Sequence, residues 1–184
     1  MPSLRFRAAG PDDAQSVAAL HADSWRRHYR GAYSDEFLDG DVLKDRRSVW
    51  QARLAAPGDY ATIMAEDEAG ALLGFVHVVF DDDDRWGSLV DNLHVTSDRK
   101  RSGIGTELMV RAATAVTDLA RSSAMYLWVL EQNTAAQQFY QALGGAKVEK
   151  TSSEPPPAAV RPGAVPQKFR ISWPDAAAVI AARA

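Results

Sequence analysis

The sequence contains no cysteine among its 184 residues. Disulfide bonds, thiolate metal ligands and cysteine nucleophiles are therefore excluded, so any catalysis must use oxygen and nitrogen groups. No apolar stretch approaches the about 20 residues of a membrane-spanning helix, and Met1 to Gly10 lacks the apolar segment of a signal peptide. We expect a cytoplasmic protein that has no membrane partner.

An excess of positive charge is also missing. The chain has 21 Lys and Arg against 24 Asp and Glu, a formal net charge of −3. Such a chain has no long-range attraction to polyanions, so we expect no nucleic-acid partner, and any bound anion must meet a local patch. With 46% hydrophobic residues, the length suits one core, and we predict a single domain over residues 1–184.

The N-terminal third predicts a strand followed by helices. Apolar and charged residues alternate in Leu4–Arg7, and Pro11 with two acidic residues marks a helix start. The helix that begins at Asp12 ends by Gly31. The predicted elements of this third are a strand at 4–7 and helical segments at 12–31, 35–38 and 42–54.

The remainder predicts six strands and two longer helices. Strands are expected at 60–66, 72–80, 88–95, 125–130, 146–151 and 168–173, and helices at 104–119 and 133–143. The helix at 104–119 joins two strands as a crossover, which makes those strands parallel neighbours. The proline-rich segment Ser152–Gln167 is expected to be a long flexible loop, and 175–184 a short helix or a frayed tail.

The strongest local signal is residues 99–106, Arg-Lys-Arg-Ser-Gly-Ile-Gly-Thr, between a strand and a helix. Glycines let backbone N–H groups approach a phosphate, and a helix N-terminus adds partial positive charge. The spacings of a nucleotide-hydrolase P-loop and of a dinucleotide-binding fold are both absent. The segment therefore indicates an anion cradle, with a solvated basic turn as the alternative.

Two segments together resemble the GNAT (GCN5-related N-acetyltransferase) superfamily. Residues 93–108 match its signature Arg/Gln-x-x-Gly-x-Gly/Ala, and residues 133–145 are similar to its second motif, Asn-x-x-Ala-x-x-x-Tyr-x-x-x-Gly-Phe. Three positions depart from the pattern, since Lys100 replaces Arg or Gln, Arg101 replaces a common Gly, and Ala146 follows Gly145 in place of an aromatic residue.

The resemblance implies an α/β fold with a mostly antiparallel mixed sheet, one parallel pair and about four flanking helices. It also implies that acetyl-CoA is bound as the acetyl donor, without a metal. The cofactor-binding residues that it implies are Leu93, His94, Val95, Lys100, Arg101, Ser102, Gly103, Ile104, Gly105, Thr106, Asn133, Ala136 and Tyr140. Plain strand packing at Leu93 and Val95 and helix capping by Asn133 are the structural alternatives.

Tyr140 is implied to be the general acid that protonates the departing thiolate, with a core tyrosine as the alternative. An amine acceptor must lose a proton at a cost of about 4.6 kcal/mol at pH 7, and the candidate bases are Glu131, Asp91 and His94. Asp91 and His94 would point to opposite faces of a regular strand, although a bulge would change this. An ordered water would remove the need for a single base.

The acceptor pocket is expected to be walled by Trp25, His28, Tyr29 and Tyr33, with the long loop nearby. These aromatic residues could equally belong to the core. The acidic run Asp81–Asp84 either attracts a cationic acceptor or forms a solvated turn.

We therefore expect an N-acetyltransferase that acts on the primary amine of a small molecule, in a possible homodimer. The alternatives are a CoA-binding sensor without turnover, a protein N-terminal or lysine acetyltransferase, and a different nucleotide-phosphate binder.

Overall fold

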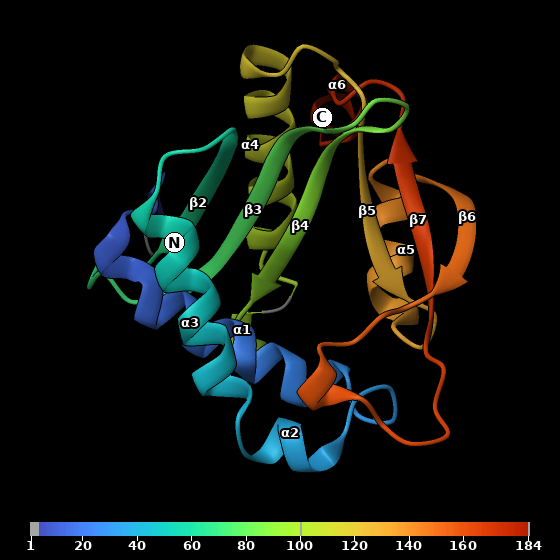
Figure 1. Cartoon of the computed structure of the whole chain (residues 1–184). Coiled ribbons are helices and arrows are strands. Elements are labelled where there is room, and N and C mark those ends of the chain that lie inside the picture. Colours follow the sequence, from blue (N-terminus) through green and yellow to red (C-terminus); the bar gives the residue numbers. More distant parts are fainter. Residues whose placement is uncertain (1–3, 100, 184) are drawn as a thin grey trace.

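A computed structural model describes residues 4–99 and 101–183, so the predicted cofactor contact Lys100 lies outside the described residues. Seven strands form one sheet in the order β1-β2-β3-β4-β5-β7-β6 (Figure 1). The strands are β1 (Arg5–Ala8), β2 (Tyr60–Glu66), β3 (Leu72–Asp83), β4 (Gly87–Val95), β5 (Met125–Leu130), β6 (Ala146–Ser152) and β7 (Gln167–Trp173). All seven predicted strands are confirmed.

Six α-helices accompany the sheet within the part of the chain that the structure describes. They are α1 (Ala14–His28), α2 (Asp35–Asp39), α3 (Val42–Ala55), α4 (Ile104–Leu119), α5 (Thr134–Ala142) and α6 (Ala177–Ala182). The four longer ones match the expected number of about four flanking helices. The two short ones, α2 and α6, have five and six residues and lie in the segments 35–38 and 175–184, for which a helical turn and a short helix were expected.

Strands β2 to β4 are covered on both faces. On one face, α4 buries its predicted apolar stripe, including Leu108, Ala112 and Val116, in the largest core cluster. On the other face, Val17 of α1 and Trp50 of α3 pack with β2 and β3 residues in a second cluster. This layering leaves α1 and α3 on one side of the sheet and α4 on the other (Figure 1).

The parallel pair is β4 with β5, as expected. Pairing is limited to Ser88 with Met125 and Leu89 with Tyr126. Figure 1 shows the two strands separating toward their C-terminal ends. The sheet is therefore continuous where β4 and β5 begin and open where they end.

The acidic run Asp81–Asp84, at the end of β3, makes structural contacts. The carboxylate of Asp81 accepts hydrogen bonds from the backbone N–H groups of Arg121 and Ser122, and Asp83 accepts two from Arg85 and Trp86. Because ladder pairing continues to Asp83, β3 is longer than predicted. Asp81 to Asp83 therefore belong to the strand, and the expected solvated turn holds only for Asp84.

The long loop between β6 and β7 lies against the N-terminal helices. It contains a 3₁₀ turn, η3 (Pro157–Ala159), whose Ala159 is fully buried. The Ser34 N–H donates to the Ala159 carbonyl at 3.0 Å, and Tyr33 hydrogen-bonds the side chain of Ser153. The predicted position near the first helix is confirmed, whereas its flexibility stays a prediction.

The C-terminal segment forms α6, whose Val179 is buried against α4, so the helical alternative is confirmed. No helix among the described residues has the length and apolar character needed to cross a membrane.

Candidate active site

Where β4 and β5 separate, a gap lies between the two strands, and backbone groups of β4 face it. His77 pairs with Asn92 and Val78 with Val90, so Asp91 is the extra residue of a β-bulge. Beyond the bulge, the Thr96 N–H donates to the Leu73 carbonyl of β3 at 2.8 Å. Because backbone groups alternate in direction along a strand, those of Leu93 and Val95 point away from β3 and toward β5.

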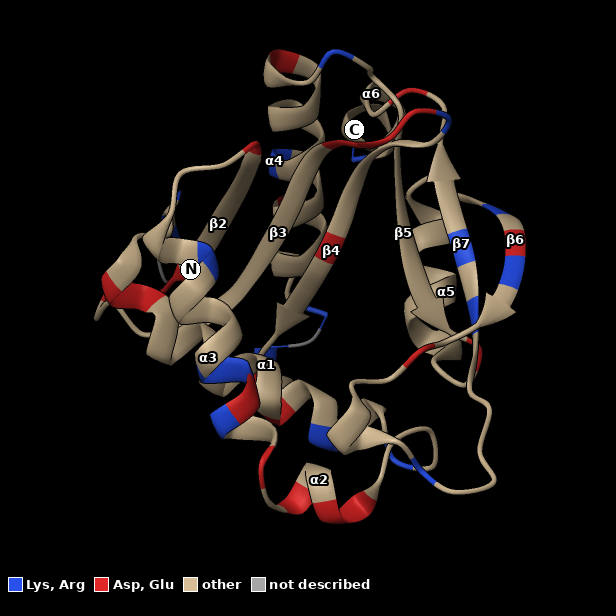
Figure 2. Ribbon diagram, in the orientation of Figure 1, with Lys and Arg blue, Asp and Glu red and all other residues tan. Residues whose placement is uncertain are grey.

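The loop after β4 has the geometry of an anion cradle. Arg101 and Gly103 both have left-handed backbones, with φ of 65° and 84°. The first N–H groups of a helix have no intrahelical acceptor, and Gly103, the N-cap of α4, has no side chain that could accept from them. Cations are present in the same loop (Figure 2). Such a loop can bind a phosphate through backbone N–H groups.

The predicted loop residues differ in what they offer to a ligand. The side chain of Ile104 is 2% exposed and belongs to the core, which leaves only its backbone N–H for a phosphate. Arg101, Ser102 and Gly103 are exposed. A Cβ added at Gly105 would lie 3.5 Å from the Phe139 ring, in the space between α4 and α5.

Asn133 caps α5, since its side-chain oxygen accepts a hydrogen bond from the Ala136 N–H at 3.3 Å. The capping alternative is thus confirmed, and it leaves the amide nitrogen of Asn133 for another partner. Ala136 packs partly buried against the core.

Tyr140 lies on α5 and is 9% exposed. Its ring packs edge-on against Phe139 and Trp173, with centroids 5.2 and 6.3 Å apart. Burial raises the pKa of the phenol above its usual value of about 10, so the hydroxyl keeps its proton at neutral pH. Burial raises the pKa of Tyr29 as well, with smaller effects of the neighbouring phenols of Tyr33 and Tyr140.

The bulge puts Asp91 on the face that α1 and α3 cover. Its carboxylate forms an ion pair with Arg53 of α3 at 2.7 Å, and Arg53 also donates to the Asn92 side chain at 3.0 Å. His94 points to the same face, because its Nδ1 lies 2.8 Å from the Ser24 hydroxyl of α1. The opposite-face expectation for a regular strand therefore does not hold, and the bulge alternative is correct.

His94 is a weak base in this position. Burial, with smaller effects of His28 and Arg46, lowers its pKa to about 3, so the imidazole is neutral at pH 7. Its side chain points to α1 and its backbone groups face β3, so the expected cofactor contact of His94 has no support in this geometry.

Glu131 follows β5 but is directed away from the gap. Its side chain is 46% exposed and forms an ion pair with Lys150 of β6 at 2.6 Å. Since β7 and β6 lie on the side of β5 opposite to β4, the structure does not bring Glu131 to the gap. The expected catalytic role of Glu131 has no support in this geometry, because its carboxylate turns toward Lys150, two strands away across β7.

The predicted acceptor wall divides into buried and accessible members. Trp25 and Tyr33 are 7% and 5% exposed, in one cluster with Leu130 and Ala159, so the core alternative describes them. Tyr29 is half-buried and stacks on Trp25 at 5.1 Å. His28 is half-buried beside it.

Two further residues near this wall gave no signal in the sequence. The guanidinium of Arg46 lies 4.2 Å from the Trp25 ring centre. The Gln132 amide donates to the carbonyls of His28 and Arg30, both at 2.9 Å, and so joins the β5–α5 loop to the end of α1. Neither contact follows a local pattern, because both join segments distant in the chain.

Comparisons with known proteins agree with this geometry. Residues 18–145 match the model of the acetyltransferase (GNAT) family. The chain is 27% identical over 178 residues to the uncharacterized N-acetyltransferase YuaI of Bacillus subtilis (strain 168), and the match covers 96% of each chain.

Two solved structures share the fold. The PaiA N-acetyltransferase from Thermoplasma acidophilum, in complex with coenzyme A, has a TM-score of 0.69 at 16% identity and covers 92% of this chain and 98% of its own. A mutant of spermidine N-acetyltransferase SpeG from Vibrio cholerae has a TM-score of 0.66 at 16% identity, with 92% of each chain covered. With a family match over most of its length, the chain belongs to the acetyltransferase (GNAT) family and is an acyltransferase.

Proposed function

We propose that the protein transfers an acetyl group from acetyl-CoA to the primary amine of a small molecule. The observation that carries the proposal is the gap between β4 and β5 beside the uncapped N-terminus of α4. The coenzyme A bound by PaiA and the spermidine acetyltransferase activity named for SpeG support the donor and the acceptor class.

The residues of this chain fit the donor. The N–H groups at the start of α4 would bind the pyrophosphate, with Arg101 contributing charge. The unpaired backbone groups of Leu93 and Val95 would hydrogen-bond the extended pantetheine arm as an added strand does. The Val95 N–H would also stabilise the oxyanion that forms at the thioester carbonyl.

The acceptor ammonium must lose two protons, and the departing thiolate must gain one. The ammonium gives the first proton to Asp91, directly or through a water, and the freed lone pair attacks the carbonyl carbon to form the C–N bond. When the tetrahedral intermediate collapses, the C–S bond breaks, the thiolate takes the proton of the Tyr140 hydroxyl, and the resulting phenolate takes the second proton from the nitrogen, which leaves the neutral amide. Because burial keeps that phenol protonated, Tyr140 suits this role.

Thiol release from acetyl-CoA, measured with a panel of amines, tests the proposal. Amine-dependent release with mass-spectrometric detection of an acetylated small molecule is the expected result. Tight CoA binding with no release for any amine or peptide would contradict turnover and favour a CoA sensor. Release with peptides alone would favour a protein acetyltransferase.

A further inference from the structure

The half of the sheet formed by β5, β7 and β6 has one face without a helix in the described part of the chain. Helix α5 packs behind it (Figure 1). On the open face, Trp128 of β5 pairs with Arg170 of β7, and Leu130 pairs with Lys168. Directly paired residues of an antiparallel ladder share a face, so two cations flank one tryptophan. Figure 2 shows these cations along β7.

Arg170 forms an ion pair with Glu149 and stacks on three aromatic rings, although its buried Nη1 has no hydrogen-bond partner. Its guanidinium lies 4.3 Å from the Trp128 ring centre and 4.7 and 4.9 Å from those of Tyr126 and Trp86. Its Nε donates to the Glu149 carboxylate at 2.8 Å. These contacts neutralise Arg170 and hold Trp128 in a fixed position.

Lys168 is not neutralised in this way. Its Nζ lies 4.5 Å from the Trp128 ring centre, and it forms no ion pair with any described residue. Burial lowers its pKa below the usual value, an effect larger than the opposing influence of Glu154 and Glu149. Lys168 is thus a partly desolvated cation that forms no ion pair within the described part of the chain, and a bound anion would stabilise it.

The position of Lys168 adjoins the acceptor wall. Its cross-strand partner Leu130 belongs to the buried cluster of Trp25 and Tyr33. The side chain of Lys168 therefore emerges beside the end of β5 at which the gap to β4 is open. A group held at its Nζ would belong to the acceptor and not to the phosphates at α4.

We propose that Lys168 binds a carboxylate of the acceptor, so that the preferred substrates are amines that also carry a carboxylate, such as amino acids. The inference rests on the proposed function and specifies its acceptor. A polyamine has only cations to offer, and Lys168 repels them. Trp128 fits the apolar part of an amino acid beside the charged contact.

Matched pairs of substrates test the inference, each an amino acid and its decarboxylated amine, such as phenylalanine with phenethylamine and lysine with cadaverine. For each pair, kcat/KM for acetylation and calorimetric binding to the CoA-loaded protein are measured. We expect the wild-type protein to favour the carboxylate member about tenfold or more, as a charged hydrogen bond does. We expect Lys168→Met to remove that preference and Lys168→Arg to retain it.

Lys147→Met is the matched control. Lys147 lies 4.6 Å from the Phe169 ring centre, but on the opposite face, because it pairs with the core residue Ile171. The Lys147→Met variant should keep the wild-type preference for the carboxylate member of each pair. Equal binding of both members by the wild type, no binding of any carboxylate member, or an unchanged preference in Lys168→Met would overturn the inference. If no amine releases thiol, the proposed function fails, while calorimetry still decides the role of Lys168.

Discussion

Burial acts on Tyr140 and His94 with opposite consequences for proton transfer. It raises the pKa of the phenol and lowers that of the imidazole, because in both cases it disfavours the charged form. The neutral phenol retains a proton to give, whereas the neutral imidazole takes one only at low pH. Two titratable residues of one site thus become a competent acid and a poor base through the same physical effect.

At the residue scale, we predict that Tyr140→Phe lowers turnover about 10²- to 10⁴-fold, the usual contribution of one positioned acid. Acetyl-CoA affinity and thermal midpoint should change little, because the ring packing is preserved. Single-turnover kinetics and calorimetry on the purified variant measure these quantities.

Tyr60→Phe is the control for loss of a phenol hydroxyl at a half-buried position. Its hydroxyl donates to the Ala56 carbonyl at 2.6 Å, so the variant should lose about 1 kcal/mol of stability and keep its turnover. Wild-type turnover in Tyr140→Phe would mean that Tyr140 is only a core residue.

At the element scale, the left-handed backbone at Gly103 sets the direction of the N–H groups at the start of α4. Gly103→Ala should cost about 1 kcal/mol of stability, since its φ of 84° disfavours a Cβ. Relaxation of this strain would turn the N–H groups, and we expect CoA affinity to fall about tenfold or more. Chemical denaturation and calorimetry measure the two effects.

Gly70→Ala separates strain from ligand binding. Gly70 has a φ of 82°, and, as at Gly103, a Cβ there would meet nothing within 4 Å. The turn between β2 and β3 that contains it forms its hydrogen bonds within itself and belongs to a different loop from the one before α4, so the variant should lose similar stability and bind CoA normally. Equal CoA affinities of the two alanine variants would show that the loop backbone before α4 does not bind CoA.

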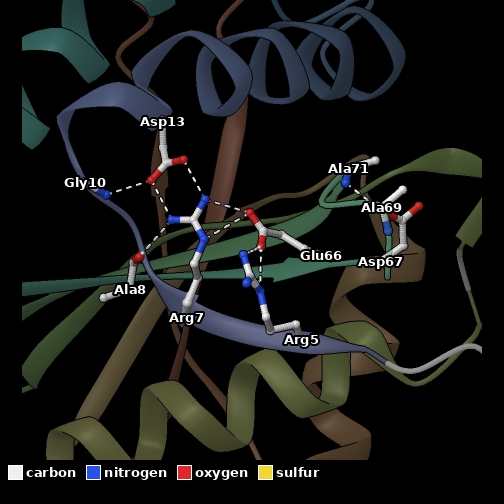
Figure 3. Close-up of polar contacts among 9 residues, drawn as sticks. All are labelled: Arg5, Arg7, Ala8, Gly10, Asp13, Glu66, Asp67, Ala69 and Ala71. Carbon is white, nitrogen blue, oxygen red and sulfur yellow. Dashed lines mark hydrogen bonds and ion pairs between the residues drawn. The ribbon is translucent and has the colours of Figure 1, made fainter.

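Three elements at the edge of the sheet are joined by Arg7 of β1 (Figure 3). Its guanidinium contacts the Glu66 carboxylate of β2 at 2.6 Å and the Asp13 carboxylate before α1 at 2.7 Å. Hydrogen bonds with Arg7 are the largest cause that lowers the pKa of both carboxyl groups. Since Glu66 is almost completely buried, this contact stabilises the packing of β1, β2 and α1.

The lowered pKa values give a direction for stability against pH. The contribution of Asp13 and Glu66 is complete above their unfolded pKa values of about 4 and is lost as the pH falls through the lower folded values. Arg7→Leu should therefore lose about 1–3 kcal/mol at pH 7 and show a shallower decline between about pH 5 and 2.

Denaturation at a series of pH values measures this decline. Arg5→Leu should lose less stability, because the Arg5 side chain is 67% exposed against 34% for Arg7 and Arg5 contacts Glu66 alone among the carboxylates. A parallel decline in Arg7→Leu and wild type would contradict the assignment.

At the scale of the whole molecule, the two halves of the sheet separate beyond the start of β5. Contacts between the end of α1, the β5–α5 loop and the β6–β7 loop join the two halves again. Gln132 donates to two carbonyls at the end of α1, and Ala159 of the long loop packs into the cluster of Trp25 and Tyr33. These contacts set the position of the α1 end against β5, and thereby the shape of the proposed acceptor site.

Gln132→Glu should raise the acceptor KM about threefold to tenfold and leave CoA affinity unchanged. The substitution replaces an N–H donor by an oxygen that faces two carbonyls, so two hydrogen bonds of about 1 kcal/mol each are lost. Gln138→Glu adds the same charge at an exposed position of α5 and should leave both constants unchanged. An unaltered acceptor KM in Gln132→Glu would show that the acceptor site does not depend on this link.

The sequence by itself determined the seven strands, the crossover helix and the loop before α4, because alternation, helical spacing and glycine placement act over a few residues. It also carried the family motifs, which are local patterns of the same kind. The tertiary structure alone decided the bulge at Asp91, the turn of Glu131 toward Lys150 and the place of Lys168 beside Leu130. These features depend on strand register and on partners far away in the chain, and no local pattern records either.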